Sequence, residues 1–462
     1  MTYLCQLFGG CRAGYYSNDI NVRRSRLIKI KEMIQMWDFS TDAEFQKKLD
    51  WIKVFVEAEC EPLDRLFPSA GDCYDVGNKK ARAIAKPLME EVKRQGLWAC
   101  HLGPELGGQG YGQVKLALMN EILGRSLWAP TIFGTAAPDT GNAEIIAMFG
   151  TDEQKKRYLQ PLLDGDIVSC YAMTEPQGGA DPGVFECKAV RDGDEWVISG
   201  EKWFASNARY AEFLIVMCVT DKKAPIYKGA SMFLMPTNTP GINILRNTGI
   251  HGEPGGIGSH GYIRFENVRL LADALLGGEG EGFAVAQARL GGGRVHHAMR
   301  TVGQCQIAIE MMCERAVSRS TKGSMLGDKQ TVQGYLADSW IELKQFRLQV
   351  LQTAWLIDQG HDYKSNQISI AGIKVMAAKV FHDIVQRAIH MHGALGVSDE
   401  MPLGHMWLYA VMMGIMDGPT EVHKATVAKT MLKNYKPAAG LFPSAHLIPR
   451  TQAARQKYEG QY

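Results

Sequence analysis

Residues 416–423 (MDGPTEVH) place a carboxylate, Asp417, on a Gly-Pro turn near the C-terminal end of the chain. An apolar run at residues 409–416 precedes the turn, and a helical pattern at residues 422–432 follows it. A carboxylate fixed between such segments is poorly solvated, and burial raises the pKa of an aspartate and makes it a stronger base. Most Asp-Gly-Pro sequences are surface turns, so this turn predicts a catalytic base only if other segments complete a site.

Length, composition and charge exclude several classes of function. The chain has 462 residues, of which 46% are hydrophobic, enough for a large core and two or three domains. The net charge is +2 and the pI about 8.0, which leaves no basic field for nucleic acid. The longest apolar run, residues 213–219, is far shorter than the ~20 residues that cross a bilayer, so we expect no membrane span.

The ten cysteines stand singly between Cys5 and Cys313, without a Cys-x-x-Cys pair or a Cys/His group at zinc spacing. This usage is typical of reduced core thiols in a cytoplasmic compartment, or in the mitochondrial matrix if the cell is eukaryotic. The adjacent His296 and His297 would point about 100° apart on a helix and suit a metal badly. Packing or surface roles are therefore favoured for both, and no metal site is predicted.

Residues 1–36 form an atypical N-terminal extension with several arginines and lysines and few acidic residues. A mitochondrial-type presequence has this composition. An upstream-extended gene start fits equally well, because Met33 and Met36 both precede a reasonable helix start. Both interpretations stay open.

Hydrophobic periodicity predicts helices, then a sheet, then helices, which is an α+β arrangement. Residues 37–165 are mainly helical, and a glycine-rich loop at residues 103–112 lacks P-loop and dinucleotide-fold spacing, so it predicts a turn between two helices. Residues 166–278 carry short β-prone runs separated by turns and predict an antiparallel β domain. Helical periodicity returns over residues 279–434, and residues 435–462 form a proline-containing tail.

Four other segments carry residue types that could share a site with Asp417. The first two lie in the predicted β domain, and the others lie in the C-terminal helices. They are residues 171–176 (YAMTEP), residues 201–207 (EKWFASN), the group Arg294, Arg319 and Gln330, and residues 392–396 (HGALG) at the end of a long helix.

With these segments in place, the sequence resembles the acyl-CoA dehydrogenase family over about residues 40–432. Order, spacing and residue types agree together, and residues 265–269 (FENVR) and 277–283 (GGEGEGF) fit as well. The chain resembles the subgroup that carries Asp-Gly-Pro where most members have Glu-Gly-Thr. The resemblance implies an N-terminal helical domain, a middle antiparallel β domain and a C-terminal four-helix bundle, with FAD between the β domain and the helices.

The resemblance also implies which residues hold FAD. Hydroxyls and backbone N–H groups around Thr174 and residues 204–206 would address the isoalloxazine, where negative charge grows on reduction. Arg319 and Gln330 match residues that reach the FAD of a second subunit, which implies a homodimer or homotetramer, and the fork of an arginine suits a pyrophosphate. Residues 390–394 match a helix end near the adenylate half. The implied cofactor contacts are Tyr171, Met173, Thr174, Ala180, Phe204, Ala205, Ser206, Arg319, Gln330, His390, Gly393, Ala394, Pro419 and Glu421.

Asp417 matches the family's catalytic base, so the resemblance implies α,β-dehydrogenation of an acyl-CoA thioester. The base would take the α-proton while a β-hydride passes to flavin N5, and electrons would continue to an electron-transferring flavoprotein. Implied substrate contacts are Ala180, Arg294 and Gly418. Aspartate is shorter than glutamate, so backbone or substrate must approach by about a bond length. Glu421 is the nearest rival carboxylate, one helical turn on, where the family contacts cofactor.

Three positions depart from the family pattern. Ala180 stands where a serine hydroxyl usually touches cofactor and substrate, which puts that contact in doubt. His390 stands where glutamine is common, and Ala394 where glycine is common.

Two other functions fit the same sequence. A nitroalkane-oxidase-like flavin oxidase on this scaffold would also use an aspartate to remove a carbon-bound proton, but it would take no CoA ester and return electrons to oxygen. A non-catalytic scaffold member is the other alternative, although Asp417, Arg294 and Arg319 argue against it because such a protein has no need of a base. Acyl chain length, branching and a steroid-type substrate all stay open.

Overall fold

A computed structural model of the protein describes residues 39–461 apart from residues 68, 76, 105–107, 251–257, 361–364 and 439. The predicted extension at residues 1–36 therefore lies outside the described residues. The compact unit that carries the features below is Thr41–Tyr462.

The first part of this unit is helical. Helix α2 begins after Asp42, whose side chain accepts a hydrogen bond from the backbone N–H of Phe45 at 2.8 Å, a typical helix N-cap. The described part of the glycine-rich loop lies between α4 and α5, as the sequence predicts. The helices are α2 (Ala43–Phe55), α3 (Leu63–Leu66), α4 (Lys79–Arg94), α5 (Gln113–Leu123), α6 (Ala129–Ile132), α7 (Asp139–Phe149), α8 (Asp152–Gln154) and α9 (Gln160–Leu163).

The middle part is a sheet in the order β6-β7-β3-β1-β4-β5-β8, with β2 paired to β3 and β4. Most neighbours are antiparallel, as predicted, but β1 and β2 each pair with β4 in parallel. The sheet is therefore mixed. Strand β1 enters at its centre, and β4 later runs beside β1 in the same direction. The strands are β1 (Ser169–Ala172), β2 (Lys188–Asp192), β3 (Glu195–Ser206), β4 (Phe213–Val219), β5 (Ala230–Pro236), β6 (Ile242–Thr248), β7 (His260–Leu271) and β8 (Leu275–Leu276), and the short α10 (Ile226–Gly229) precedes β5.

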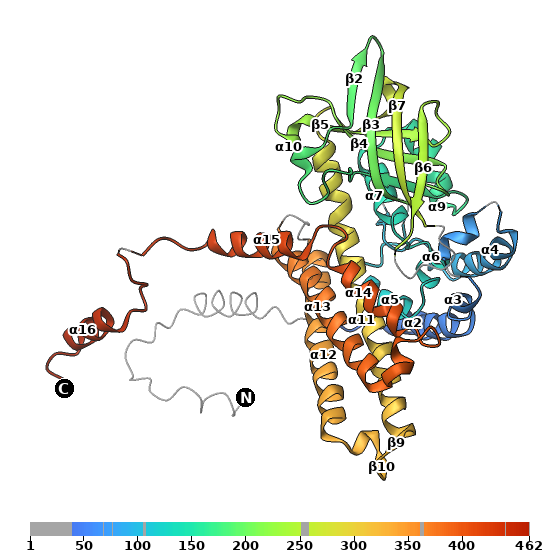
Figure 1. Ribbon diagram of the computed structural model, residues 1–462. Coiled ribbons are helices and arrows are strands. Elements are labelled where there is room, and N and C mark those ends of the chain that lie inside the picture. The colour runs from blue at the N-terminus through green and yellow to red at the C-terminus, as the bar shows by residue number, and fades with distance from the viewer. Residues whose placement is uncertain are drawn as a thin grey trace, which may run out of the picture. The chain divides into compact units, whose positions relative to one another are not determined.

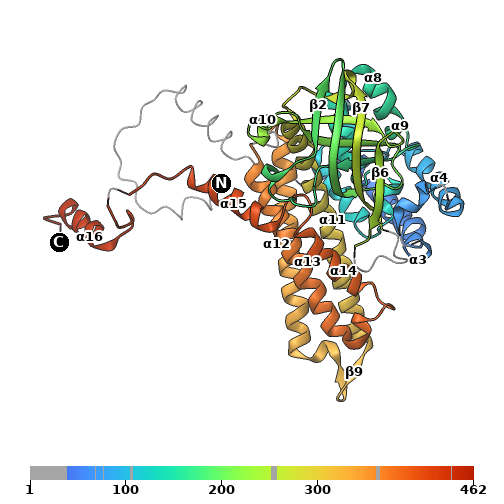
Figure 2. The same ribbon diagram turned by 45° about the horizontal axis from the view of Figure 1, so that its top comes forward.

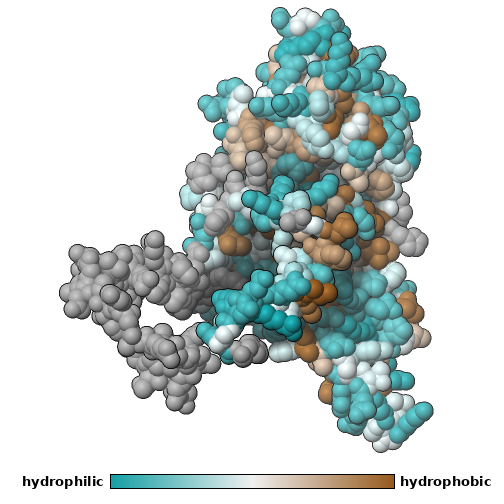
Figure 3. All heavy atoms as spheres, turned by 90° about the vertical axis from the view of Figure 1, so that its left-hand side faces the viewer, coloured by the Kyte–Doolittle hydropathy of each residue, from teal (hydrophilic) through white to brown (hydrophobic). Residues whose placement is uncertain are grey.

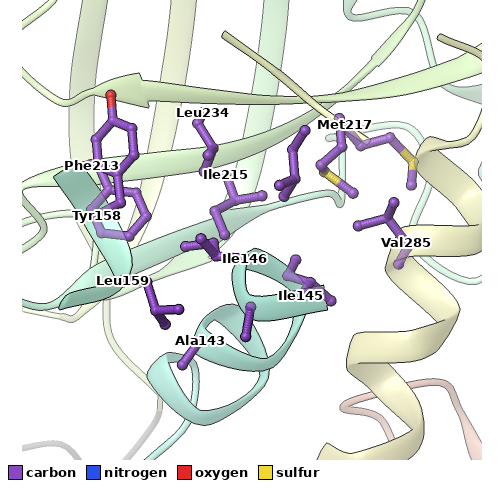
Figure 4. Close-up of a cluster of buried hydrophobic side chains, with 14 of the residues drawn as sticks. Ala143, Ile145, Ile146, Tyr158, Leu159, Phe213, Ile215, Met217, Leu234 and Val285 are labelled. Atoms are coloured by element: carbon purple, nitrogen blue, oxygen red, sulfur yellow. The ribbon is translucent and has the colours of Figure 1, made fainter. Parts of the chain in front are cut away.

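Strand β4 has buried side chains on both faces, which explains its uninterrupted apolar sequence. Phe213, Ile215 and Met217 face α7, where Ile145 and Ile146 meet them (Figure 4). Val285 of the next long helix joins the same cluster. Alternate residues of β4 face a second cluster within the sheet domain. The first cluster joins the N-terminal helices, the sheet and the C-terminal helices in one core.

The C-terminal part is a bundle around one long helix. Helix α11 has 37 residues and therefore spans ~55 Å. It runs from beneath the sheet to the β9–β10 hairpin (Figure 1), with α12 and α13 beside it in both ribbon views (Figure 2). The elements are α11 (Gly282–Ser318), β9 (Ser320–Thr321), β10 (Ser324–Met325), α12 (Gln330–Asp358), α13 (Gln367–His392), α14 (Leu403–Met413), α15 (Thr420–Leu432) and α16 (Leu447–Lys457).

The described cysteines and helices have the properties that the composition predicts: core thiols and no membrane span. Of the eight cysteines in the described ranges, Cys313 is exposed and the others are buried and free, as expected for core thiols. None of the helices in the part of the chain that the structure describes is both long and apolar enough to cross a membrane. Figure 3 shows one face of the molecule, on which hydrophilic side chains predominate and hydrophobic ones form small groups.

A buried ion pair fixes the segment that follows β1. The Lys202 ammonium lies 2.7 Å from a Glu175 carboxylate oxygen, and both side chains are almost fully buried. Lys202 also donates to the carbonyl of Met173 at 2.9 Å. Glu175 accepts hydrogen bonds from the backbone N–H groups of Glu186 at 2.7 Å and Cys187 at 3.1 Å. Residues 173–175 are therefore tied to β3 and to the chain entering β2.

We expect Lys202→Met to destabilise the fold by ~3–5 kcal/mol, because it leaves Glu175 charged and buried without its cation. Urea unfolding followed by circular dichroism measures this change as a lower midpoint. The matched control is Arg264→Met, which breaks the exposed pair between Arg264 and Glu201 at 2.8 Å and should shift the midpoint far less. Equal shifts in the two variants would contradict the role given to burial.

Candidate functional site

The backbone at Asp417 is held in an unusual conformation. Asp417 has φ +55° and Gly418 has φ +98°. Pro419 follows them and stands directly before the first turn of α15. The left-handed region costs a residue other than glycine ~1–3 kcal/mol and persists only where its surroundings fix it. Here the Asp417 carbonyl oxygen accepts a hydrogen bond from Arg294 Nε at 2.9 Å, and His423 Nε2 lies 3.2 Å from the same oxygen. The predicted Gly-Pro turn is thus fastened from α11 and α15.

The Asp417 side chain lies against α11 and is 20% exposed. Its Oδ2 is 3.5 Å from Nε2 of His297. A Cβ built on Gly293 would lie 3.5 Å from Oδ2, an ordinary van der Waals distance, so the carboxylate lies close to the backbone of α11. The carboxylate is therefore enclosed, with helix α11 as one wall.

Positive charge surrounds this carboxylate. Burial raises the pKa of Asp417, but the charges of His297, Arg289, Arg294 and Lys374 outweigh burial, so the pKa lies below its usual value of 3.8. The prediction of a raised pKa is therefore wrong. Burial alone would raise this pKa, but folding also brings cations of α11 and α13 to the carboxylate, and the sequence does not show that they lie there. Asp417 is ionised at neutral pH and can accept a proton.

The cations around Asp417 do not contribute equally at neutral pH. Burial, and then the charge of Arg300, lower the pKa of His297 to about 3. Its imidazole is therefore neutral at pH 7 and adds no charge. Burial lowers the pKa of Lys374 to about 8, partly offset by Asp417, so Lys374 is mostly charged. The positive field at pH 7 therefore comes from Arg289, Arg294 and Lys374 rather than from the imidazole.

A cavity of about 260 Å³ is lined by His297, the histidine that contacts Asp417, but not by Asp417 itself. Its other lining residues come from the N-terminal part of the chain, the start of the β domain, α11 and α14. His297 therefore contacts both the cavity and the carboxylate. The volume is slightly below the ~300 Å³ at which typical small-ligand sites begin. The lining from the C-terminal helices consists of His297, Arg300, Gln304, Tyr409 and Met413.

Two segments predicted to hold a cofactor lie side by side in the β domain. The backbone N–H of Trp203 donates to the carbonyl of Thr174 at 2.9 Å. Phe204 has φ +52°, is 49% exposed and stacks on Trp203 with ring centroids 4.7 Å apart. Ser206 Oγ is 3.0 Å from His260 Nδ1. Ala205 is fully buried in the core of the sheet domain.

Tyr171, Met173 and Ala180 belong to the same region but differ in environment. Tyr171 in β1 lies under the guanidinium of Arg289, whose Cζ is 3.9 Å from the ring centroid. The Tyr171 hydroxyl is 3.6 Å from the Met173 sulfur. Ala180 is exposed in the loop beyond. Arg289 thus packs on Tyr171 of β1 and is also one of the cations that lower the pKa of Asp417.

Five of the predicted cofactor residues lie far from Asp417 within one chain. Arg319 comes at the end of α11, 25 residues and therefore ~37 Å along the helix from Arg294. The end of α13 lies toward the start of α12, because Arg387 pairs with Glu342 at 2.8 Å. The five residues are all exposed: Arg319, Gln330, His390, Gly393 and Ala394. The structure does not bring them to the Asp417 pocket of their own chain.

The remaining predicted residues flank Asp417. Arg294 contacts the Asp417 backbone, as described above, so its observed role is to hold this turn. Pro419 precedes the first residue of α15, and Glu421 is exposed in its first turn. The exposure of Glu421 favours Asp417 as the functional carboxylate of the two.

Sequence reasoning missed His297, His423, Lys374 and Arg289. One signal was available, because His297 follows Gly293 and Arg294 by four and three positions and so shares their helix face. His423 also lies in the same short segment as Asp417, six residues on, whereas Lys374 and Arg289 carry no local signal because they meet Asp417 only through the fold.

Comparisons with known proteins identify the family of the chain. Three family models match: acyl-CoA dehydrogenase, N-terminal domain, over residues 44–166, middle domain over residues 170–268, and C-terminal domain over residues 280–432. The chain is 42% identical over 373 residues to the probable acyl-CoA dehydrogenase FadE2 of Mycobacterium tuberculosis, covering 79% of this chain and 90% of that protein. The chain belongs to the acyl-CoA dehydrogenase family, as the resemblance predicted.

Other relatives give the extent of the match. Acyl-CoA dehydrogenase family member 10 of Mus musculus is 39% identical over 359 residues, which cover 76% of this chain and 34% of that protein. The chain spans about a third to a half of the length of several curated relatives. The solved structure of a putative acyl-CoA dehydrogenase from Mycobacterium abscessus is 36% identical, with a TM-score of 0.79 over 86% of this chain and 100% of that chain. The fold is that of acyl-CoA dehydrogenases, with helices, a middle β domain and helices.

We expect Gly418→Ala to destabilise the protein by ~1–3 kcal/mol, because alanine is strained at φ +98° and its Cβ would lie 3.0 Å from His423 Nε2. Gly404→Ala is the matched control, since Gly404 lies in α14 with open space at the Cβ position and should gain stability slightly. Thermal unfolding of both variants measures the difference. A Gly418→Ala protein as stable as the wild type would show that this turn is not fastened as described.

Proposed function

We propose that the protein is an FAD-dependent acyl-CoA dehydrogenase of the subgroup that uses an aspartate, with Asp417 as its base. The observation that supports this most is the ionised carboxylate of Asp417 on a fixed backbone, in contact with a histidine that lines a cavity. General bases positioned in this way contribute ~10²–10⁴-fold to the rate of proton transfer. The substrate class is an acyl-CoA thioester, whose acyl chain would occupy the cavity.

The residues of the β domain fit FAD. Thr174 and Ser206 offer hydroxyl groups, and the half-exposed ring of Phe204 offers a flat wall. Bound FAD would supply the acceptor for the hydride that leaves the β-carbon. The Lys202–Glu175 pair keeps Thr174 in place, and the stacked Trp203 supports Phe204.

The chain's own groups account for the handling of the proton. Asp417 takes the α-proton, and the cations Arg289, Arg294 and Lys374 lower the energy of negative charge that develops in the substrate at that moment. The backbone N–H of residue 417 polarises the thioester carbonyl. The contacts of Arg294 and His423 with the Asp417 carbonyl fix the next peptide, between residues 417 and 418, and so restrain the backbone of Asp417 from its C-terminal side.

Several features of the proposal concern partners. Arg319, Gln330 and residues 390–394 would reach the FAD of a second copy, which their exposure and their distance from Asp417 support. Electrons would pass to an electron-transferring flavoprotein, in a fatty acid oxidation pathway of the cytoplasm or the mitochondrial matrix. A protomer alone would then hold FAD poorly.

A nitroalkane-oxidase-like activity is the second candidate. The lowered pKa of Asp417 favours it, because a weaker base suits a carbon acid that is more acidic than a thioester. Such an enzyme would return electrons to oxygen and take no CoA ester.

Anaerobic mixing of the yellow holoprotein with panels of acyl-CoA esters and nitroalkanes distinguishes these functions. We expect acyl-CoA to bleach the flavin absorbance, and Asp417→Asn to retain FAD while bleaching ~10²–10⁴-fold more slowly, since the base is lost. Glu421→Gln tests the rival carboxylate and should still bleach. If bleaching survives in Asp417→Asn but is lost in Glu421→Gln, the base is Glu421 and not Asp417. Bleaching by nitroalkanes alone would favour the oxidase.

A further inference from the structure

His297 is placed to act on Asp417 directly. It lies on α11 one turn beyond Gly293 and Arg294, and its Nε2 is 3.5 Å from Oδ2 of Asp417. Its side chain is 9% exposed, so water cannot easily replace this contact. The imidazole also lines the cavity beside the base. A buried polar ring that contacts both a carboxylate and a cavity has an environment that ordinary packing does not require.

The charges around His297 determine the form of its ring. Arg300 and Arg289 share helix α11 with it, Lys374 lies on α13, and Asp417 is its anionic neighbour. Three cations against one anion, together with burial, keep the imidazole neutral. A neutral imidazole has one N–H and one lone pair. Beside an ionised carboxylate, the tautomer with its hydrogen on Nε2 is favoured, because a lone pair there would face the negative charge of Oδ2.

We propose that His297 is the positioning residue for Asp417: its Nε2–H, 3.5 Å from Oδ2 and so beyond the usual length of a hydrogen bond, attracts this oxygen, so that the other carboxylate oxygen faces the α-carbon of the substrate. The proposal rests on the proposed function of Asp417. The Arg294 and His423 contacts are made to the backbone carbonyl of residue 417 and do not involve its carboxylate. His297 supplies the missing constraint on the side chain, which a short base with little reach requires.

Two substitutions separate this role from packing. His297→Leu fills the space without a donor, and His297→Gln retains an N–H at similar reach. In anaerobic single-turnover mixing, we expect His297→Leu to lower the limiting rate of flavin reduction ~10²-fold, since small displacements of reacting groups have effects of that size. Half-saturation by acyl-CoA should change little, and His297→Gln should recover most of the rate.

His296→Leu is the matched control. His296 is the adjacent buried histidine on α11, its Nε2 has no partner within the described ranges, and it does not contact Asp417 in the structure. Its replacement removes an imidazole of the same helix and should leave the limiting rate unchanged. A loss equal to that of His297→Leu would indicate general damage to α11 and overturn the proposal.

A second readout does not depend on flavin reduction. In protein with ¹³C-labelled aspartate carboxyls, the Asp417 signal is assigned by its absence from Asp417→Asn, and its titration is followed by NMR. We expect the titration of Asp417 to move to higher pH in His297→Leu, because a donor to the ionised carboxylate is lost. It should stay near the wild-type position in His297→Gln.

The outcomes are distinguishable. Unchanged rate and unchanged titration in His297→Leu would overturn the positioning role, as would a folded, yellow His297→Gln that is as slow as His297→Leu. If His297→Leu fails to fold, His297→Gln alone decides through the same two readouts. If none of the acyl-CoA esters reduces the flavin of the wild type, the proposed function fails. The titration still tests the contact between His297 and Asp417.

Discussion

One carbonyl oxygen organises the site. The oxygen of Asp417 accepts from Arg294 and lies within hydrogen-bond distance of His423, and these contacts hold the residue at a positive φ that its own side chain disfavours. The carboxylate can keep its contact with His297 only if this peptide stays in place. Helices α14 and α15 meet at this turn, and α11 supplies the guanidinium that fixes it.

Helix α11 links this constraint to the rest of the molecule. Near its start, Val285 packs with α7 and β4, so the helix is anchored to both the N-terminal helices and the sheet (Figure 4). Farther along, Arg289 covers Tyr171 of β1, Arg294 holds the Asp417 turn and His297 contacts its carboxylate. The residues that contact Asp417 and the β domain therefore keep their spacing, because one long helix carries them.

Much of the fold and the main candidates could be predicted from the sequence. The order of helical and β segments is encoded in local periodicity, and β4 is evident as an apolar run. Asp417 and Thr174 lie in short motifs whose residue types and order can be recognised without coordinates. The family assignment follows from the same motifs, and the comparisons confirm it.

The electrostatics of the site could not be predicted in this way. Lys374 and Arg289 affect Asp417 only because folding joins residues that are remote in sequence, so the sequence suggested a raised pKa where the cations lower it. His297 was assigned to packing because its neighbour, 120 positions later, was unknown. The parallel pairing of β1 with β4 likewise depends on the path of the chain and not on the pattern of either strand.

A crystal structure of the holoprotein with an acyl-CoA analogue that cannot be oxidised tests the central claim most directly. The account predicts an Asp417 carboxylate oxygen ~3–3.5 Å from the α-carbon, as a near-attack geometry requires, with Arg294 still bound to the carbonyl of residue 417. A carboxylate turned away from the ligand, or an α-carbon that contacts a different base, would contradict it.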